Sequence, residues 1–375
     1  MDRLIVKNFG PLKDVDIELN KINLFIGENG SGKSVLAKII TIILNFSKSK
    51  ENDMLKKFKE YNINYISENS IISFYSEDKL IIELKNKNFF LNQNIKKIKE
   101  QLQAIKPDIE YLISTFSDHI HVDEIFGTFE ESSTFKQVYQ MTSQYIPAER
   151  NFVTIISKSL SSFIVADIPL PKFFLRFASE FEKAGNELKE LEFLNVKYVN
   201  GDGLDRHNVY FNDKDYLPLE FSSSGIQSAL PLYLTVKYFA DRHSSIIIEE
   251  PEQNLFPKAQ AETIKYIVEQ VSGKNNLFLM THSPYVLSTL NNLIFAYKVA
   301  QISEKTKEQV KDFIKEEQWI NPDEFSAYYL EDGVAKNIVS KRGLISDNEI
   351  DNISDEMGDE FDTLMEIYRE FKYAK

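Results

Sequence analysis

The residues best suited to chemistry are a glycine-rich run near the N-terminus that ends in a lysine and a serine. Residues 27–34 read Gly-Glu-Asn-Gly-Ser-Gly-Lys-Ser, which is the spacing of a phosphate-binding loop. Glycine permits positive φ and close backbone approach, so that successive N–H groups point at an anion. We predict that Lys33 contacts the β and γ phosphates and that the Ser34 hydroxyl ligates Mg²⁺. The predicted nucleotide contacts are Gly27, Asn29, Gly30, Ser31, Gly32, Lys33, Ser34 and Val35.

Carboxylates follow an apolar run later in the chain. Ile246-Ile247-Ile248 leads into Glu249-Glu250-Pro251-Glu252. Acidic groups at the carboxyl end of a parallel strand face the crevice in which α/β proteins bind ligands. We therefore assign Glu249 to Mg²⁺, through its water shell, and Glu250 to polarising the attacking water.

A histidine and a serine cluster complete the candidate site. Thr281-His282-Ser283-Pro284 follows the next apolar run, and His282 is predicted to contact the γ-phosphate. Ser222-Ser223-Ser224-Gly225-Ile226-Gln227 opens a predicted helix, whose free N–H groups form a seat for an anion. One chain is poorly placed to bring this seat to its own Lys33. We therefore predict a head-to-tail dimer in which Ser224, Gly225 and Gln227 close the site of the partner; the alternative is a plain serine N-cap.

Strands and helices at suitable positions surround these motifs. Period-2 and helical patterns of apolar residues distinguish the two kinds of element. The expected strands are 2–7, 15–20, 24–26, 144–151, 246–250, 277–280 and one near 293–299; the expected helices include 34–46, 224–241, 257–271 and a short helix from Pro284.

This order predicts an α/β P-loop NTPase with an inserted region. The expected parts are an N-terminal portion with the phosphate loop, a mostly helical insertion, a C-terminal portion with the carboxylates and His282, and a hairpin with an acidic helical tail. Their boundaries are 1–92, 93–192, 193–300 and 301–375.

Taken in order, the motifs resemble the ABC-type ATPase heads of the SMC/RecF group. The nearest resemblance is to OLD-like (overcoming lysogenization defect) and related bacterial AAA-family ATPases, and it covers about residues 1–300, including LIVKNFGPLKDVDIEL and QYIPAERN. It implies Mg²⁺-dependent hydrolysis of ATP held between two heads. It also implies a glutamine that helps to hold the metal, for which Gln144 is the candidate, while Arg150 is left as a structural residue.

The sequence also departs from that resemblance. Glu249 stands where many ABC proteins have aspartate, no long coiled coil is visible in 93–192, and no Toprim nuclease motif follows His282. The acidic residues after 347 are interpreted as a solvated helical face. The pattern His119-Ile-His121-Val-Asp123-Glu124 is not interpreted as a metal site, because no other histidine is nearby in sequence.

Composition narrows the function classes. The 375 residues include 44 basic and 57 acidic side chains, a net charge of −13, and no cysteine. An acidic chain argues against DNA binding by broad electrostatics, although lysines between Lys85 and Lys99 leave a local contact open. No signal peptide or membrane-length apolar run is visible, which predicts a cytoplasmic protein without membrane partners.

Two principal functions follow. The first is a nucleotide-gated, dimerising switch that controls a separate effector protein, as in bacterial anti-phage systems. The alternative is a RecF-like ATPase that binds DNA in repair or recombination. A nuclease within this chain is a third and weaker hypothesis.

Overall fold

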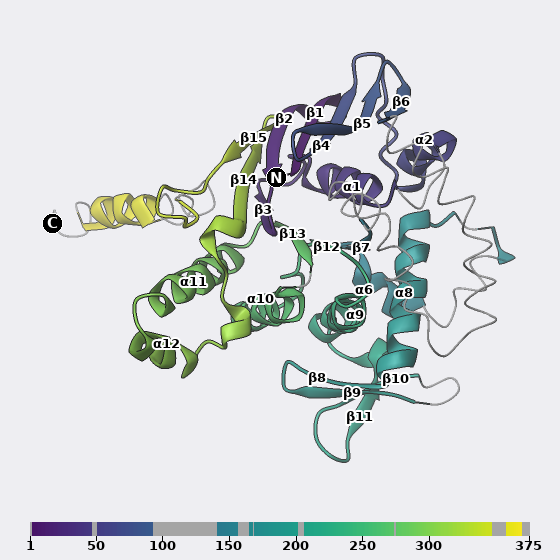
Figure 1. The fold of residues 1–375 in the computed structure, drawn as a ribbon. Helices are drawn as coiled ribbons and strands as arrows, with labels where there is room; N and C mark the ends of the chain where they lie inside the picture. The colour runs from purple at the N-terminus through teal and green to yellow at the C-terminus, as the bar shows by residue number, and fades with distance from the viewer. Residues whose placement is uncertain are drawn as a thin grey trace.

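A computed structural model provides the fold (Figure 1). It describes residues 2–46, 51–92, 141–156, 165–167, 169–201, 206–273, 275–346 and 358–369. The pattern at 119–124, which the sequence does not favour as a metal site, and the acidic residues at 347–357 lie outside these ranges.

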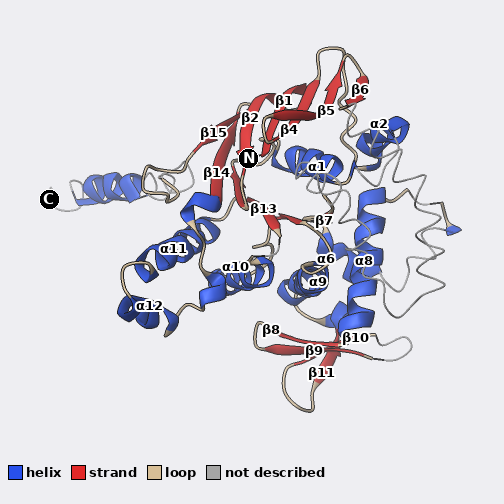
Figure 2. Ribbon diagram, viewed as in Figure 1, coloured by secondary structure: helices blue, strands red, loops and turns tan. Residues whose placement is uncertain are grey.

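An eleven-stranded sheet forms the centre of the described structure (Figure 2). Its strand order is β6-β5-β4-β1-β2-β15-β14-β3-β13-β12-β7. The strands are β1 (Asp2–Phe9), β2 (Leu12–Leu19), β3 (Ile22–Ile26), β4 (Ile71–Ser76), β5 (Lys79–Lys85), β6 (Asn88–Leu91), β7 (Ser143–Ile146), β12 (Ser245–Glu249), β13 (Asn276–Thr281), β14 (Phe325–Glu331) and β15 (Val334–Asn337).

The two halves of this sheet differ in strand direction. The pairs β14–β3, β3–β13, β13–β12 and β12–β7 are parallel, whereas β1, β2, β4, β5 and β6 form an antiparallel half. Every residue of β3 and β12 is buried, as expected for parallel strands that are covered on both faces. All five parallel strands therefore end at one edge.

Helices cover the parallel half. The first, α1, starts within the phosphate loop and contacts β7, β12 and β13, while α9 contacts β7. Their bounds are α1 (Lys33–Leu44), α2 (Glu51–Glu60), α6 (Arg150–Ile156), α8 (Lys172–Leu188), α9 (Ser224–Phe239), α10 (Pro257–Val271), α11 (Pro284–Ala300) and α12 (Glu304–Lys311), with short 3₁₀ turns η4 (Leu219–Phe221), η5 (Glu316–Gln318) and η6 (Pro322–Glu324).

A second, four-stranded sheet lies at the far end of the molecule from β4–β6 (Figure 1). A partly buried chain of hydrogen bonds attaches it to α8: the Tyr198 hydroxyl lies 3.1 Å from His207 Nδ1, and His207 Nε2 lies 3.2 Å from Glu182 Oε1. Its strands are β8 (Glu190–Phe193), β9 (Val196–Asn200), β10 (His207–Tyr210) and β11 (Tyr216–Pro218).

Most of the predicted elements around the motifs are present, but two predictions are wrong. The strand expected over 144–151 ends at Ile146, where Pro147 offers no N–H to a strand ladder, and Arg150 already begins α6. The segment 293–299 is not a strand but the last part of α11 (Pro284–Ala300). Its buried residues Leu290, Leu293 and Ile294 repeat at helical spacing with Leu287. The apolar run was too short for its period to separate strand from helix.

The proposed domain boundaries remain a proposal, but the main sheet crosses them. From within 93–192, β7 contributes an edge strand, and from 301–375 the β14–β15 hairpin lies between β2 and β3. The described part of the insertion therefore shares the core of the main sheet. Within the described ranges, no helix combines the length and apolarity that a bilayer crossing requires.

The β14–β15 turn is fastened to the N-terminal hairpin at Gly333. Its carbonyl accepts hydrogen bonds from the backbone N–H groups of Lys13 (2.8 Å) and Asp14 (3.1 Å). Gly333 has φ +80°, and a Cβ there would collide with the Pro11 carbonyl. Only glycine fits this turn without strain.

We expect Gly333→Ala to lower the free energy of unfolding by about 3 kcal/mol, since left-handed strain and overpacking add. Gly273→Ala is the matched control, because Gly273 also has positive φ (+71°) but has no atom within 4 Å of its would-be Cβ. That control should cost about 1 kcal/mol. Urea denaturation measures both, and equal losses would contradict the close approach.

Candidate functional site

The carboxyl ends of the parallel strands bring the predicted site residues to one edge of the sheet. Ile26 pairs with Thr281, and Glu249 pairs with Met280. The ends of β3, β13 and β12 are therefore in register. The phosphate loop, His282 and Glu250 directly follow these strand ends. This is the edge at which α/β proteins bind ligands.

Lys33 lies inside the curl of the phosphate loop. Its Nζ donates to the carbonyl oxygens of Gly27 (2.6 Å) and Glu28 (2.8 Å). Burial lowers the pKa of Lys33, and the nearby carboxylates of Glu250, Glu252 and Glu249 oppose that change, with Glu250 contributing most. Lys33 therefore lies close enough to these carboxylates for their charges to interact.

Glu249 is buried, and its carboxylate meets the hydroxyls of Ser34 and of a tyrosine. The Tyr145 hydroxyl donates to Glu249 Oε1 at 2.5 Å, and the Ser34 hydroxyl is a second hydrogen-bond partner of this carboxylate. Burial raises the pKa of Glu249, and these two hydrogen bonds partly offset the increase. A hydroxyl and a carboxylate side by side are oxygen ligands of the kind that Mg²⁺ prefers, with phosphate and water oxygens completing its shell.

Protein side chains alone do not complete a metal site here. In the described ranges, no three His, Cys, Asp or Glu residues cluster closely enough to hold an ion. The Ser34–Glu249 pair accordingly fits a metal that arrives with a phosphate ligand, rather than a metal in an all-protein cage.

Glu250 and His282 face each other across the end of the sheet. The distance from His282 Nδ1 to Glu250 Oε1 is 4.0 Å, and both side chains are partly exposed. Glu250 has φ +44°, which is uncommon for a residue with a Cβ. The backbone turns at Glu250, just after β12 ends, and the Glu250 carboxylate lies near Lys33 and His282.

Glu252 is a residue of this site to which the sequence analysis gave no role. Its Oε1 accepts hydrogen bonds from the Thr281 hydroxyl (2.6 Å) and the His282 N–H (3.1 Å), and it lies 3.7 Å from His282 Nδ1. Its buried Oε2 has no hydrogen-bond partner among the described residues. Glu252 therefore fixes the turn that carries His282, and its place in the Glu-Glu-Pro-Glu run was the available signal.

Gln144 is not brought to the metal residues. Its Nε2 donates to Glu180 Oε2 on α8 at 2.5 Å. Tyr145, the next residue of β7, faces the opposite side and reaches Glu249. Side chains alternate along a strand, so the choice between Gln144 and Tyr145 depended on which face of β7 meets α1.

The serine cluster begins α9, as predicted, but Gln227 has a local role. Ser223 and Ser224 are exposed, and no side chain caps the helix start. The Gln227 amide donates to the carbonyls of Glu220 (2.8 Å) and Ser222 (3.0 Å), so it shapes the preceding turn. A Cβ at Gly225 would lie 3.0 Å from the Asn254 carbonyl, which places this helix start against the loop that follows β12.

Comparison with known sequences identifies the family. The AAA ATPase domain family matches residues 1–172 and 154–287, well over half of the 375 residues. The chain belongs to the AAA ATPase domain family. Its predicted α/β P-loop ATPase fold is confirmed by this match and by the sheet. No curated protein matches this AAA ATPase domain chain.

Solved structures similar to this AAA ATPase domain protein include heads of SMC proteins. The SMC head domain from Thermotoga maritima is 13% identical, with a TM-score of 0.39, over 90% of this chain and 97% of that one. An Smc head domain with an extended coiled coil, bound to the C-terminal domain of ScpA derived from Pyrococcus furiosus, is 14% identical, with a TM-score of 0.37, over 90% and 96%. These values describe a distant likeness of fold.

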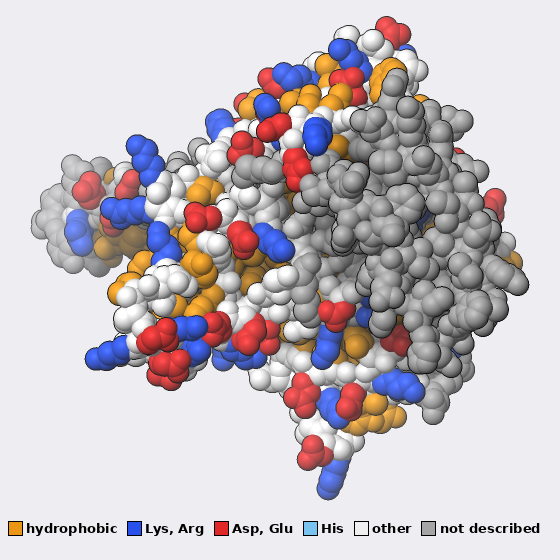
Figure 3. Space-filling model, in the orientation of Figure 1, with side chains coloured by type: hydrophobic (Ala, Val, Ile, Leu, Met, Phe, Trp, Pro, Cys, Tyr) orange, Lys and Arg blue, Asp and Glu red, His pale blue; other side chains and the backbone are white. Residues whose placement is uncertain are grey.

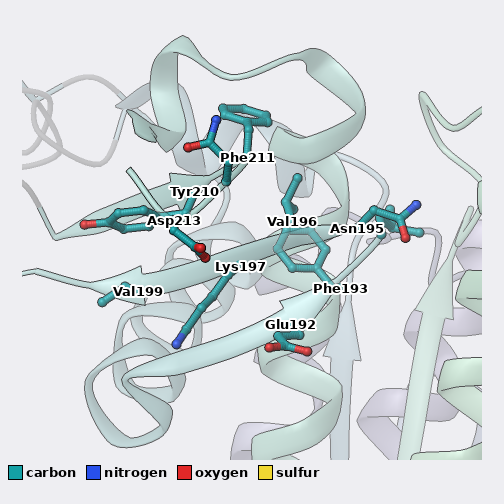
Figure 4. Close-up of a pocket in the computed structure, with 11 residues that line it drawn as sticks. Glu192, Phe193, Asn195, Val196, Lys197, Val199, Tyr210, Phe211 and Asp213 are labelled. Atoms are coloured by element: carbon teal, nitrogen blue, oxygen red, sulfur yellow. The ribbon is translucent and has the colours of Figure 1, made fainter. Parts of the chain in front are cut away.

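Two of the hollows outside the carboxylate cluster lie beside the phosphate loop and on the small sheet. One, of about 390 Å³, adjoins the phosphate loop and is bordered by Pro11, Lys13 and the β14–β15 turn. The other, of about 790 Å³, is an open groove on the small sheet, near Phe193, Lys197 and Phe211 (Figure 4). None of the residues predicted to bind nucleotide lines the groove on the small sheet.

We expect Tyr145→Phe to raise the pKa of Glu249 further, because the carboxylate loses one of the two hydrogen bonds that favour its charged form. The carboxyl group should then stay protonated to a higher pH. Difference infrared spectroscopy of the protonated carboxyl stretch measures this, and Glu249→Gln identifies the band.

Tyr61→Phe is the control for that change. Tyr61 packs against Tyr145 with ring centroids 5.8 Å apart, but its hydroxyl accepts a hydrogen bond from Arg176 and not from a site residue. The control should leave the Glu249 band unmoved. An equal shift in both variants would show that packing, and not the hydroxyl, governs the carboxyl group.

Proposed function

We propose that the chain is a Mg²⁺-dependent ATPase whose heads pair around ATP and thereby control a separate effector protein. The observation that carries this proposal is the meeting of Lys33, Ser34, Glu249 and Glu250 at one sheet edge. A cation, a hydroxyl and two carboxylates in this arrangement suit the binding and hydrolysis of a nucleoside triphosphate.

Each residue then has one role. The loop N–H groups and Lys33 hold the phosphates. Ser34 and Glu249 would hold Mg²⁺, which would supply positive charge beside the phosphate oxygens. Glu250 accepts the proton of the attacking water. His282, supported by Glu252, contacts the γ-phosphate from the neighbouring strand.

The hollow of about 390 Å³ beside the loop suits the nucleoside half of ATP. It continues from Glu28–Ser31 of the loop to the β1–β2 turn and the β14–β15 turn. A ligand seated there keeps its phosphates over the loop and its base against Pro11 and Lys13.

Exposed rings around the α9 start favour pairing of two heads. Phe221, which precedes the helix, is 70% exposed, and Phe256, at the end of the loop that contacts Gly225, is 78% exposed. Ile155 of α6, a helix that contacts η4, is also exposed. Apolar groups gathered beside an open anion seat are typical of an interaction surface, and a second head can cover them.

The effector and an anti-phage role rest on the resemblance to OLD-like ATPases. A switch of this kind needs a partner that acts when the heads join.

Direct DNA binding, as in RecF-like proteins, is the second candidate. The observation in its favour is the β5–β6 hairpin, where Lys85 and Lys87 stand beside the half-exposed Phe90. Lys87, however, pairs with Glu68 at 3.3 Å. Acidic and basic side chains are also interspersed over the described surface in Figure 3, and the net charge is −13. We therefore favour the switch.

We expect Glu250→Gln to slow ATP turnover by about 10²-fold or more, because the base that accepts the water proton is lost while the nucleotide contacts remain. The ATP-bound dimer should then accumulate on size-exclusion chromatography. Lys33→Ala should show neither nucleotide binding nor a dimer. Glu262→Gln, on the surface of α10, is the control that should match wild type; normal turnover in Glu250→Gln would refute the assignment.

We expect Phe256→Asp, introduced into the Glu250→Gln background, to weaken ATP-dependent dimerisation by about tenfold or more, because a charge replaces an apolar contact at the interface. Binding of ATP to the monomer should be unchanged. Phe313→Asp is the matched control, since Phe313 is 71% exposed but follows α12. Sedimentation velocity reports both, and equal dimerisation of the two variants would exclude this surface.

A further inference from the structure

Arg150 is a fully buried cation at the first position of α6, directly behind the carboxylates. Its exposed fraction is 0%, and it is the largest of the fully buried side chains. Every hydrogen bond that its guanidinium donates to the described residues goes to a backbone carbonyl, and none goes to a side-chain carboxylate.

Those carbonyls come from three separate segments. One NH group donates to Pro147 (3.3 Å), at the end of β7, and to Glu249 (2.8 Å), and the other donates to Glu250 (2.5 Å). Nε donates to Ser228 of α9 at 3.0 Å. One rigid guanidinium therefore joins β7, the catalytic end of β12 and the helix of the serine seat.

Burial lowers the pKa of Arg150 to about 10, and the charges of Glu252, Glu250 and Glu249 limit the decrease. The side chain therefore stays charged near neutral pH. A buried charge is retained only when it is well paired, so the three carboxylates stabilise the charged form of Arg150. Arg150 in turn donates hydrogen bonds to the backbone carbonyls of Glu249 and Glu250.

The backbone of Glu250 needs such support. Its φ of +44° is strained for a residue with a Cβ. Its N–H donates to the Met280 carbonyl at 2.8 Å, and its carbonyl accepts from Arg150. Strained conformations persist where the surroundings determine them from several sides. The direction of the Glu250 side chain therefore depends on Arg150.

The link to α9 begins one turn from the serine seat. Ser228 follows Ser224 by four residues, so both lie on one side of the helix. Its carbonyl accepts from Arg150, and its hydroxyl donates to Gln253 Oε1 at 3.0 Å. A shift of α9 must move the hydrogen-bond partner of the Glu250 carbonyl.

We propose that Arg150 is a positioning residue that transmits contact at the start of α9 to the backbone of Glu250, and so sets this carboxylate for water activation only when a second head is engaged. The inference rests on the proposed function, because it needs ATP hydrolysis between paired heads. It adds a regulatory connection from the serine seat of a head to the general base of that same head.

The test compares Arg150→Met and Arg150→Lys in the full chain by single-turnover hydrolysis of bound ATP. This rate is counted per bound nucleotide, so a smaller folded fraction does not change it. We expect Arg150→Met to lose about 10- to 100-fold in that rate, as a misplaced catalytic group does. ATP affinity and ATP-dependent dimerisation should stay within about threefold, a difference below 1 kcal/mol.

Arg150→Lys should recover part of the rate, since it keeps the charge but has no planar fork to span three segments. Arg242→Met is the matched control. Arg242 also lies near α9, donating to the Tyr238 carbonyl at 2.5 Å and stacking over the Tyr238 ring at 3.8 Å. This change should lower thermal stability but leave the rate per bound ATP at the wild-type value.

The outcomes separate the two proposals. Wild-type protein that does not hydrolyse ATP would overturn the proposed function itself. Active wild type with an undiminished rate in Arg150→Met would overturn only the positioning role, as would a folded Arg150→Met that no longer binds ATP. Where Arg150→Met does not fold, Arg150→Lys decides: a folded protein with a reduced rate supports the inference, and an unchanged rate refutes it.

Discussion

The burial of charge at the end of β12 is the constraint on which the rest of the site depends. Glu249 and Glu252 are buried, and carboxylates out of water are tolerated only with hydrogen bonds and opposite charge nearby. Lys33 supplies that charge from the phosphate loop, and Arg150 supplies it from behind the strand. Neither cation is free to move, because each binds backbone carbonyls. The charged side chains that stabilise the shape of this pocket therefore include Lys33, a residue that is also predicted to bind phosphate.

The sheet explains how distant parts of the chain reach this cluster. Parallel strands direct their carboxyl ends to one edge, so β3, β13, β12 and β7 deliver the loop, His282, the carboxylates and Tyr145 together. The C-terminal hairpin adds a support from the other side: a Cβ at Gly27 would collide with the carbonyl of Leu330. The phosphate loop thus packs against a strand some 300 residues away in sequence, and Gly27 is needed for that contact as well as for phosphate.

The sequence predicted features that depend on a few neighbouring residues, and it missed features that depend on tertiary contacts. The glycine loop, Glu249-Glu250 and Thr281-His282 are short patterns whose chemistry can be identified without a fold. That Tyr145, and not the predicted Gln144, faces the site follows from the orientation of β7, which the sequence of a four-residue strand does not reveal. The helix that contains 293–299 required knowledge of its neighbours, because the apolar run suits either element. Arg150 lies in the QYIPAERN segment, but its hydrogen-bond partners are backbone carbonyls. Because every residue has a carbonyl, the sequence alone does not identify these partners.

The glutamate at 249 illustrates how the surroundings compensate for a changed side chain. Glutamate has one more rotatable bond than aspartate, so more conformational entropy is lost when its carboxylate is fixed. The Tyr145 hydroxyl takes one oxygen of this carboxylate, and Tyr145 is itself packed against Tyr61 and Phe173, with ring centroids 5.8 and 6.0 Å away. Ser34, on the first turn of α1, is the second partner. The longer side chain is therefore held at its far end by an aromatic cluster that includes Tyr61, which follows α2, and Phe173 of α8. The position of the predicted metal ligand is consequently sensitive to the packing of helices that contain no predicted site residue.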